Sequence, residues 1–331
     1  MNNTIQNDVF EAIRQYEPHN PFLKVKNPYG GKLIRHNTIF ETLQLENGKL
    51  CAIAKSPNVF TYYRGEPDIF ETCLPSLYRG NPSEEDILIN QLKALDFRDI
   101  CRTFPPVQFA EADGLNVRYD AIAQHYGLKT NIVDITNDIS VAAYFATQQY
   151  DEDTDSYHPV RDGAGCIRNT FPMMSMHEFQ GIIIGVQPFY RTARQCAYGY
   201  VCKPGEDFAK SSTAIIFRQD VRMNQIVNDV FAQKDEDNLF PAELITYAAK
   251  EVVKASSITK KTLEEYCSTT HREYGDTVQI LRNYGFDVTE NPIFKLTRQQ
   301  KRTLEKQIQR GYPYGKIQFT SRLMAYSPKL T

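Results

Sequence analysis

Residues 121–147 read AIAQHYGLKTNIVDITNDISVAAYFAT and place reactive polar side chains beside a large apolar surface. Gly127 follows a short apolar run and permits the positive φ that commonly ends a helix. The run Thr130 to Thr136 has the composition of a strand, and Ile139 to Phe145 is apolar, Ala-rich and long enough for a buried helix. The stretch therefore predicts helix, glycine stop, strand, turn and helix.

The charged residue of this stretch is Asp134, which lies between Val133 and Ile135. Burying a carboxylate in an apolar strand costs free energy unless hydrogen bonds compensate for the lost water. Gln124, His125 and Tyr126 come shortly before it. We therefore expect a functional site here, whose reaction the stretch alone does not name.

Length and composition set the outer bounds. The 331 residues allow one large or two modest domains, and the net charge of -2 gives no global reason to expect a nucleic-acid partner. The seven Cys contain no CxxC pair, which fits free thiols in a reducing cytoplasm. No signal-peptide pattern opens the chain, and no apolar run approaches the roughly 20 residues that span a bilayer. We expect a cytoplasmic protein without a membrane partner.

Secondary-structure patterns along the chain indicate both strands and helices. Helical spacing occurs at 8–16 and at 296–310. Another helix is expected to begin at Ser83, where Ser83 and Asp86 resemble a capping box. Strand-like runs lie at 32–34, 41–45, 50–53, 59–63, 181–186, 198–202 and 214–217, while 151–162 is expected to be an exposed acidic loop. The predicted fold is α+β, with a mixed β-sheet core surrounded by helices and a smaller, mostly helical C-terminal region.

Several motifs in one order resemble the FRG domain, a family named after a Phe-Arg-Gly motif. Tyr63-Arg64-Gly65 stands for that motif, and Leu74 to Arg79 (LPSLYR) follows it. The segment AQHYG-x-x-T-x-x-x-D-x-T, with Thr130, Asp134 and Thr136 at its fixed positions, is similar to the central signature, and VAAYFAT follows. Arg191-x-x-x-Gln195 and Phe240-Pro241 resemble later family features.

The resemblance covers roughly residues 55–254 and divides the chain. It implies an N-terminal extension with short strands at 1–54, an FRG domain at 55–254, and a C-terminal helical region with a basic tail at 255–331. Asn131 and Ile135 stand where the family usually carries Arg and Trp. The family resemblance implies a bacterial or phage-associated protein, often near defence or toxin systems.

Three of the candidate site residues can have either a functional or a structural role. Arg64 can bind a phosphate or carboxylate, or pair with an internal carboxylate such as Asp134. His125 can act as general acid or base, or be a satisfied core histidine. Asp134 can orient His125, accept a proton from substrate, or cap the next helix. The candidate catalytic residues are His125, Tyr126, Asp134 and Glu243. The candidate ligand-binding residues are Arg64, Gly65, Arg79, Gln124, Thr130, Thr136, Arg191, Gln195 and Ser212.

The order Arg64, Ser212, Glu243 resembles that of ADP-ribosyltransferases, which hold NAD with the Arg and use the Glu on the ribose. The leading hypothesis is thus a nucleotide- or NAD-using transferase in bacterial or phage conflict, with NAD as candidate cofactor. A metal-independent ribonuclease acting on RNA through His125, and a non-catalytic module that senses a small-molecule ligand or a phage protein, are the alternatives. The oligomeric state is left open.

The sequence lacks the motifs that are typical of metal sites, phosphate-binding loops and serine hydrolases. The six His are scattered, so no metal site is predicted. Gly-rich phosphate loops and a GxSxG elbow are absent from the sequence. The basic run 296–310 could face RNA or an acidic protein target, although a solvated helix face explains it as well.

Overall fold

The computed structural model describes residues 5–20, 23, 39–54, 61–170, 182–231, 238–309 and 318–324. Of the strands expected from sequence, 32–34 and the start of 59–63 lie outside these residues. The last residue of the basic helix and the end of the basic tail also lie outside them.

A five-stranded sheet forms the centre, in the order β8-β4-β3-β7-β9. Every pairing within it is antiparallel. Its strands are β3 (Tyr62–Glu66), β4 (Ile132–Thr136), β7 (Ala164–Thr170), β8 (Ala197–Val201) and β9 (Thr213–Arg218). β3 pairs with β7 along its whole length but with β4 at one position only, Tyr63 with Thr136. The two strands separate beyond that pair, which leaves backbone groups of β4 available to side chains.

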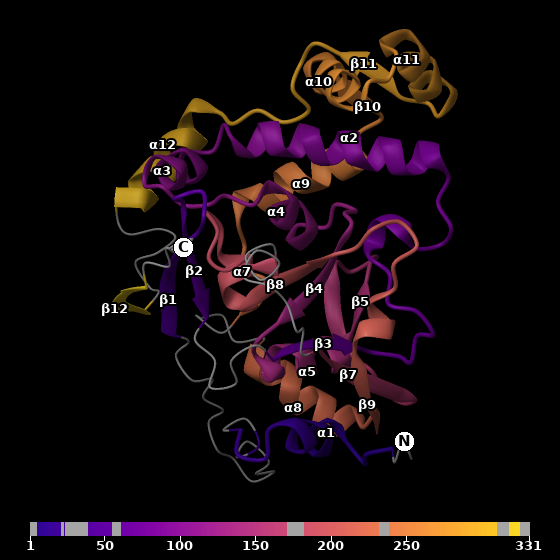
Figure 1. The fold of residues 1–331 in the computed structure, drawn as a ribbon, viewed down its shortest axis with the longest axis vertical. Coiled ribbons are helices and arrows are strands. Elements are labelled where there is room, and N and C mark those ends of the chain that lie inside the picture. The colour runs from indigo at the N-terminus through magenta and orange to yellow at the C-terminus, as the bar shows by residue number, and fades with distance from the viewer. Residues whose placement is uncertain are drawn as a thin grey trace, which may run out of the picture.

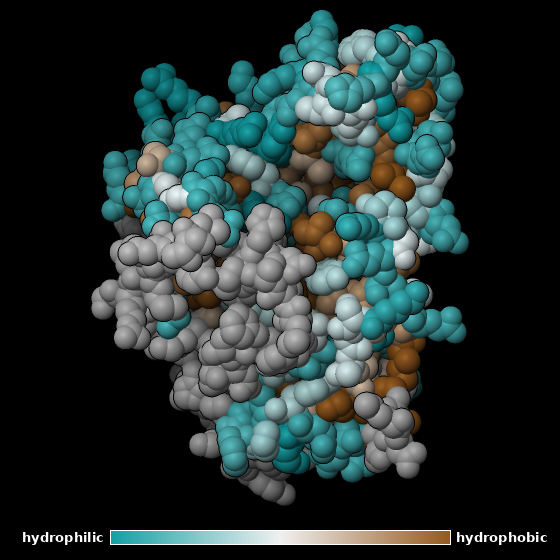
Figure 2. Space-filling model, viewed as in Figure 1, coloured by the Kyte–Doolittle hydropathy of each residue, from teal (hydrophilic) through white to brown (hydrophobic). Residues whose placement is uncertain are grey.

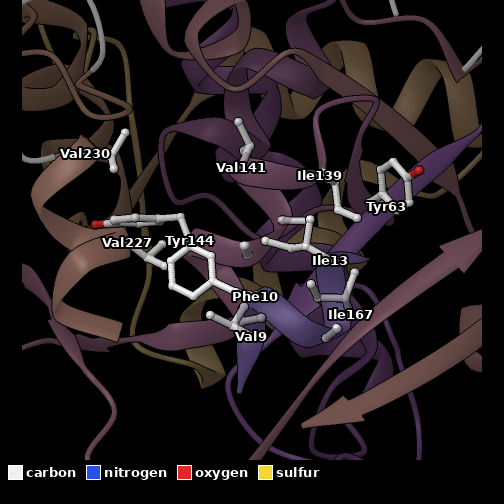
Figure 3. Packing of buried hydrophobic residues seen from close by; sticks show 14 of the residues in the cluster. Val9, Phe10, Ile13, Tyr63, Ile139, Val141, Tyr144, Ile167, Val227 and Val230 are labelled. Carbon is white, nitrogen blue, oxygen red and sulfur yellow. The ribbon is translucent and has the colours of Figure 1, made fainter. Parts of the chain in front are cut away.

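Helices lie on both sides of this sheet (Figure 1). One group packs beneath β3, β7 and β9: α1 (Val9–Tyr16), α5 (Ile139–Thr147) and α8 (Val221–Phe231). The second group comprises α2 (Glu84–Cys101), α4 (Tyr119–His125) and α9 (Leu244–Lys254), with α3 (Pro105–Ala112) and α12 (Arg298–Gln309) packed together at one end. Figure 3 shows the core between α1, α5, α8 and the sheet, where Phe10, Ile13, Tyr144 and Ile167 meet.

Local sequence signals place the helix ends. Asp8 caps α1 by accepting from the Glu11 amide at 3.0 Å, and Ser83 with Asp86 forms the predicted capping box of α2. Gly127 has φ +92° directly after α4, which confirms the predicted glycine stop. β4 and α5 follow as predicted.

Smaller sheets supply the parallel pairings. β1 (Ile39–Gln44) is antiparallel to β2 (Leu50–Ala54) and parallel to β12 (Gln318–Met324). β10 (Ser257–Thr259) is parallel to β11 (Asp287–Thr289), beside α10 (Lys260–Thr270) and α11 (Tyr274–Asn283). The predicted α+β fold with mixed sheets and a helical C-terminal region is confirmed.

Two local expectations are wrong. The segment expected to be a loop at 151–162 contains most of a hairpin, β5 (Gln148–Asp151) with β6 (Ser156–Pro159). The apolar run expected as a strand at 181–186 makes one isolated bridge, Ile183 with Tyr198, within its described part. The chain turns there at Gly185, whose φ is +62°. The apolar run is therefore buried without forming the continuous hydrogen-bond ladder of a β-strand.

The C-terminal helices share a core with α2. Leu88 and Leu92 of α2 lie in one buried cluster with Leu263 of α10 and Leu281 of α11. The three-part division of the chain stays a prediction.

Hydrophilic residues cover most of the end formed by α10 and α11 (Figure 2). Within the described ranges no helix is long and apolar enough to cross a membrane.

Gly65 fixes the distance between β3 and α5. A Cβ atom at this position would lie 1.8 Å from the Ala142 carbonyl oxygen and 2.5 Å from the Ala146 amide nitrogen. Any side chain would therefore push the helix away from the strand. The close approach that the sequence suggested for a ligand at Gly65 is made by α5.

We predict that Gly65→Ala lowers the free energy of unfolding by about 3 kcal/mol or more, because the backbone of α5 cannot yield to an added methyl group. Gly275→Ala is the matched control, since nothing lies within 4 Å of its Cβ position in α11. It should leave stability unchanged or raise it by up to about 1 kcal/mol. Urea unfolding followed by circular dichroism measures both, and equal stability of the two variants would contradict the prediction.

Candidate functional site

Alternation along β3 sends Arg64 and Glu66 to the face opposite Gly65. Glu66 is 3% exposed and lies between two guanidinium groups. It accepts from Arg64 Nε at 3.3 Å and from Arg168 Nε, on β7, at 2.6 Å. Burial alone would raise the pKa of Glu66, but the charge of Arg64 and the bonds from Cys73 and Arg168 hold that pKa below its ordinary value. One carboxylate thus serves two arginines.

Arg64 also bridges the gap between the separating strands. Its NH1 donates to the backbone carbonyl of Asp134 at 2.9 Å, which replaces a ladder bond between β3 and β4. Its NH2 makes no hydrogen bond to the part of the chain that the structure describes. Arg79 follows the 3-10 turn Ser76–Tyr78 and is fixed through Nε to the Leu74 carbonyl at 2.9 Å. Burial and the nearby charge of Arg64 lower the pKa of Arg79.

The Asp134 side chain faces α4 from β4. Gln124 Nε2 donates to Asp134 Oδ2 at 3.0 Å. The amide oxygen of Gln124 in turn accepts from the Thr130 hydroxyl at 2.6 Å, and the Thr130 amide donates to the Ser76 hydroxyl at 3.1 Å. The side chain of Asp134 remains 37% exposed. The carboxylate is therefore held by neighbours yet open to solvent.

His125 lies behind Asp134 with only 3% of its side chain exposed. Its Nδ1 is 3.0 Å from Gln195 Oε1, and Gln195 Nε2 donates to the Leu239 carbonyl at 3.2 Å. Because an amide oxygen can only accept, Nδ1 of His125 carries a proton. His125 Nε2 and Asp134 Oδ1 then face each other at 3.7 Å, and neither atom has another partner among the described residues. This pair of buried polar atoms without hydrogen-bond partners marks the candidate acid–base position of the site.

A second buried group supports the histidine from behind. Tyr126 donates its hydroxyl proton to Glu243 Oε2, and Glu243 Oε1 accepts from the Tyr190 amide at 2.9 Å. Arg191, on α7 (Tyr190–Arg194), donates to the His125 carbonyl at 3.0 Å and lies 4.5 Å from the Tyr126 ring centroid. Burial and the Glu243 carboxylate raise the pKa of Tyr126 well above its ordinary value. Tyr126, Arg191 and Glu243 thus hold the backbone at the end of α4, where His125 lies.

Most of the residues singled out by sequence are brought together, and two are not. Thr136 donates to the Gln195 carbonyl at 2.8 Å, which ties β4 to the end of α7. Ser212 bonds back to the Phe208 carbonyl at 3.1 Å, at the start of β9, on the far side of β7 from β3. Gly65 faces α5. The expected trio Arg64, Ser212 and Glu243 is therefore not one constellation.

The comparisons with known proteins agree with the motifs. Residues 60–155 match the family model of the FRG domain. The chain carries an FRG domain. Searches of curated proteins and of solved structures returned no significant match.

The geometry explains the FRG signature of this chain. The Arg of Tyr63-Arg64-Gly65 holds the Asp134 carbonyl, and the Gly admits α5. Ile135, where the family usually has Trp, is 3% exposed and packs on the opposite side of β4 from Asp134. Asn131, where the family usually has Arg, reaches the Cys202 carbonyl at 3.4 Å at the start of β4.

Sequence reasoning missed Glu66 and Arg168. The available signal for Glu66 was alternation, because residues 64 and 66 of a strand point to the same face. Arg168 lies directly across from Arg64 in the register of β3 and β7, which no sequence pattern indicates. Within the described ranges no three His, Cys, Asp or Glu side chains are grouped to hold a metal ion.

We predict that Glu66→Gln destabilises the fold by about 3 kcal/mol, because two buried guanidinium groups lose their shared counter-charge. The folded-state pKa of Glu66 is depressed, so its contribution is present above the ordinary glutamate value of about 4.5 and is lost as pH falls through the folded pKa. The stability difference between wild type and variant should therefore shrink below that pH. Urea unfolding at pH values from about 3 to about 7 measures this stability difference. A difference that does not change with pH would contradict the role given to the Glu66 carboxylate.

For Glu243 we predict a positioning role. Glu243→Gln keeps one acceptor for the Tyr190 amide and a donor for the Tyr126 oxygen, so it should lower stability by about 1 kcal/mol and activity less than tenfold. Tyr126→Phe leaves a buried carboxylate oxygen without its donor and should cost more, about 2 kcal/mol. Thermal unfolding and turnover assays check this. A loss of turnover in Glu243→Gln with an intact fold would instead make the carboxylate catalytic.

Proposed function

We propose that the FRG domain of this chain is a nucleotide-using enzyme that transfers ADP-ribose from NAD. The observation that carries the proposal is the pair His125 Nε2 and Asp134 Oδ1. These atoms face each other 3.7 Å apart without another partner among the described residues, beside two arginines with unengaged nitrogens. Asp134 takes the role that sequence order suggested for Glu243, because both oxygens of Glu243 are already bonded.

Charge supports an anionic ligand. Arg64, Arg79 and Arg168 carry three positive charges, while Glu66 and Asp134 carry two negative charges, which leaves one positive charge in excess. Burial and the charge of Arg64 lower the pKa of Arg79, and an anion near the two guanidinium groups would offset the repulsion between them. Phosphate oxygens accept from guanidinium N–H groups in this geometry.

The proposed step breaks the bond between C1′ of the ribose and the nicotinamide nitrogen. Nicotinamide leaves with the bonding electron pair, and an oxygen or nitrogen nucleophile of water or of a target forms the new bond to C1′. Asp134, whose side chain is 37% exposed, accepts the proton that the nucleophile loses and releases it to solvent, while His125 lies behind the carboxylate. General acid–base help of this kind contributes roughly 10²- to 10⁴-fold.

RNA cleavage is less well supported by the geometry. A metal-independent ribonuclease would need an imidazole in contact with the scissile phosphodiester, and the His125 side chain is only 3% exposed. A sensing module without chemistry would use the same arginines for its ligand. Incubation with labelled RNA in EDTA tests the first alternative, and binding without turnover would identify the second.

We expect NAD to bind in calorimetric titration and free nicotinamide to accumulate, with ADP-ribose detected by mass analysis on water or a target. Asp134→Asn should lower turnover by at least about 100-fold while NAD still binds. Arg79→Ala should weaken NAD binding about tenfold, since a charge-assisted contact is lost. Arg222→Ala is the matched control, as this arginine on α8 has an 83% exposed side chain.

The outcomes separate the hypotheses. Full turnover in Asp134→Asn would remove the carboxylate from the mechanism. An absence of both NAD binding and nicotinamide release by the wild-type protein would end the proposal of ADP-ribosyl transfer. Circular dichroism of each variant shows whether a loss reflects the site or the fold.

A further inference from the structure

An exposed apolar pair lies beside the arginine cluster and takes no part in the core. Ile69 is 48% exposed and Phe70 is 47% exposed. Isolated apolar residues on a surface are common. These two are adjacent, and they belong to the segment between β3, which contains Arg64, and the 3-10 turn that Arg79 follows.

This segment is held in place by bonds from distant residues. Gln219 Nε2 donates to the Pro67 carbonyl at 2.9 Å, and Arg168 NH2 donates to the Phe70 carbonyl at 3.1 Å. The Cys73 amide donates to Asp207 Oδ1 at 2.8 Å. The backbone that presents Phe70 is thus anchored before it, at it and after it.

Polar contacts also link the Phe70 backbone to the arginines. Arg64 contacts Glu66 at 3.3 Å, Glu66 contacts Arg168 at 2.6 Å, and Arg168 contacts the Phe70 carbonyl at 3.1 Å. Three consecutive contacts therefore connect the guanidinium of Arg64 to the backbone of Phe70. A nucleotide offers both of the groups that such a surface could bind, an anionic phosphate for the arginines and a flat base for the ring.

We propose that Phe70 is the stacking platform for the heteroaromatic base of the nucleotide, with Ile69 beside it. The inference rests on the function proposed above for its ligand class, and it adds the residue that distinguishes a nucleotide from a bare sugar phosphate. An aromatic ring offers stacking to any base, and such contacts are sequence-tolerant. Phe70 contacts ligand and takes no part in the transfer of ADP-ribose.

The test compares AMP with ribose 5-phosphate, two probes that differ only in the base. Isothermal titration of the full chain should give an affinity for AMP at least about tenfold higher than for ribose 5-phosphate. Phe70→Ala should bring the two affinities within about twofold of each other, and Phe70→Tyr should retain the preference. Because the side chain is half exposed, neither change should affect folding.

Phe109→Ala is the matched control, since Phe109 on α3 is 45% exposed and lies away from the cluster. It should leave the AMP preference unchanged. Arg79→Ala should weaken AMP and ribose 5-phosphate by the same factor, because both carry the phosphate.

The titrations with AMP and ribose 5-phosphate need no turnover. The Phe70 platform and the proposed ADP-ribosyl transfer can therefore be rejected independently of each other. A Phe70-dependent AMP preference without nicotinamide release from NAD would keep the platform and reject the transferase. Nicotinamide release with an unchanged AMP preference in Phe70→Ala would reject the platform and keep the transferase. Equal affinity of wild type for the two probes, or binding of neither, would also overturn the platform and would leave a protein partner as the occupant of this surface.

Discussion

The contact between Gly65 and α5 is the constraint on which the site depends. The Ala142 carbonyl oxygen occupies the space that a Cβ atom at residue 65 would need. The strand therefore lies directly on the helix, and alternation turns Arg64 and Glu66 to the opposite face. The same helix begins just after β4, so its position also sets where Asp134 lies relative to Arg64. One missing side chain thereby aligns both charged partners.

Buried polar contacts then carry this alignment across the domain. From Arg64 the chain of contacts runs through the Asp134 carbonyl, the Asp134 carboxylate, His125 and Gln195 to the Leu239 carbonyl. Each member except the His125–Asp134 pair has a conventional donor and acceptor. The pair joins a buried histidine to a carboxylate whose side chain as a whole is 37% exposed, a combination that suits acid–base chemistry.

Much of the fold follows from local sequence because its signals are local. The Ser83–Asp86 capping box, the Gly127 stop and the strand and helix after it depend on neighbours within a few residues. The apolar run near Ile183 was misjudged because buried strands and buried coil have the same composition. The hairpin containing Tyr157 was missed because its strands are short and polar enough to resemble a loop.

Sequence by itself determined the FRG motifs, the order of helices and strands around Asp134, and the grouping of Gln124, His125 and Tyr126 near it. These features depend on residue type and short spacing. Only tertiary structure decided that Glu66 joins Arg64 to Arg168, that Glu243 bonds Tyr126, and that Ser212 lies apart. Those outcomes depend on strand order, register and helix packing, which bring together residues up to 117 positions apart. The physical reason is that hydrogen bonds and burial act over a few ångströms in space, whatever the separation along the chain.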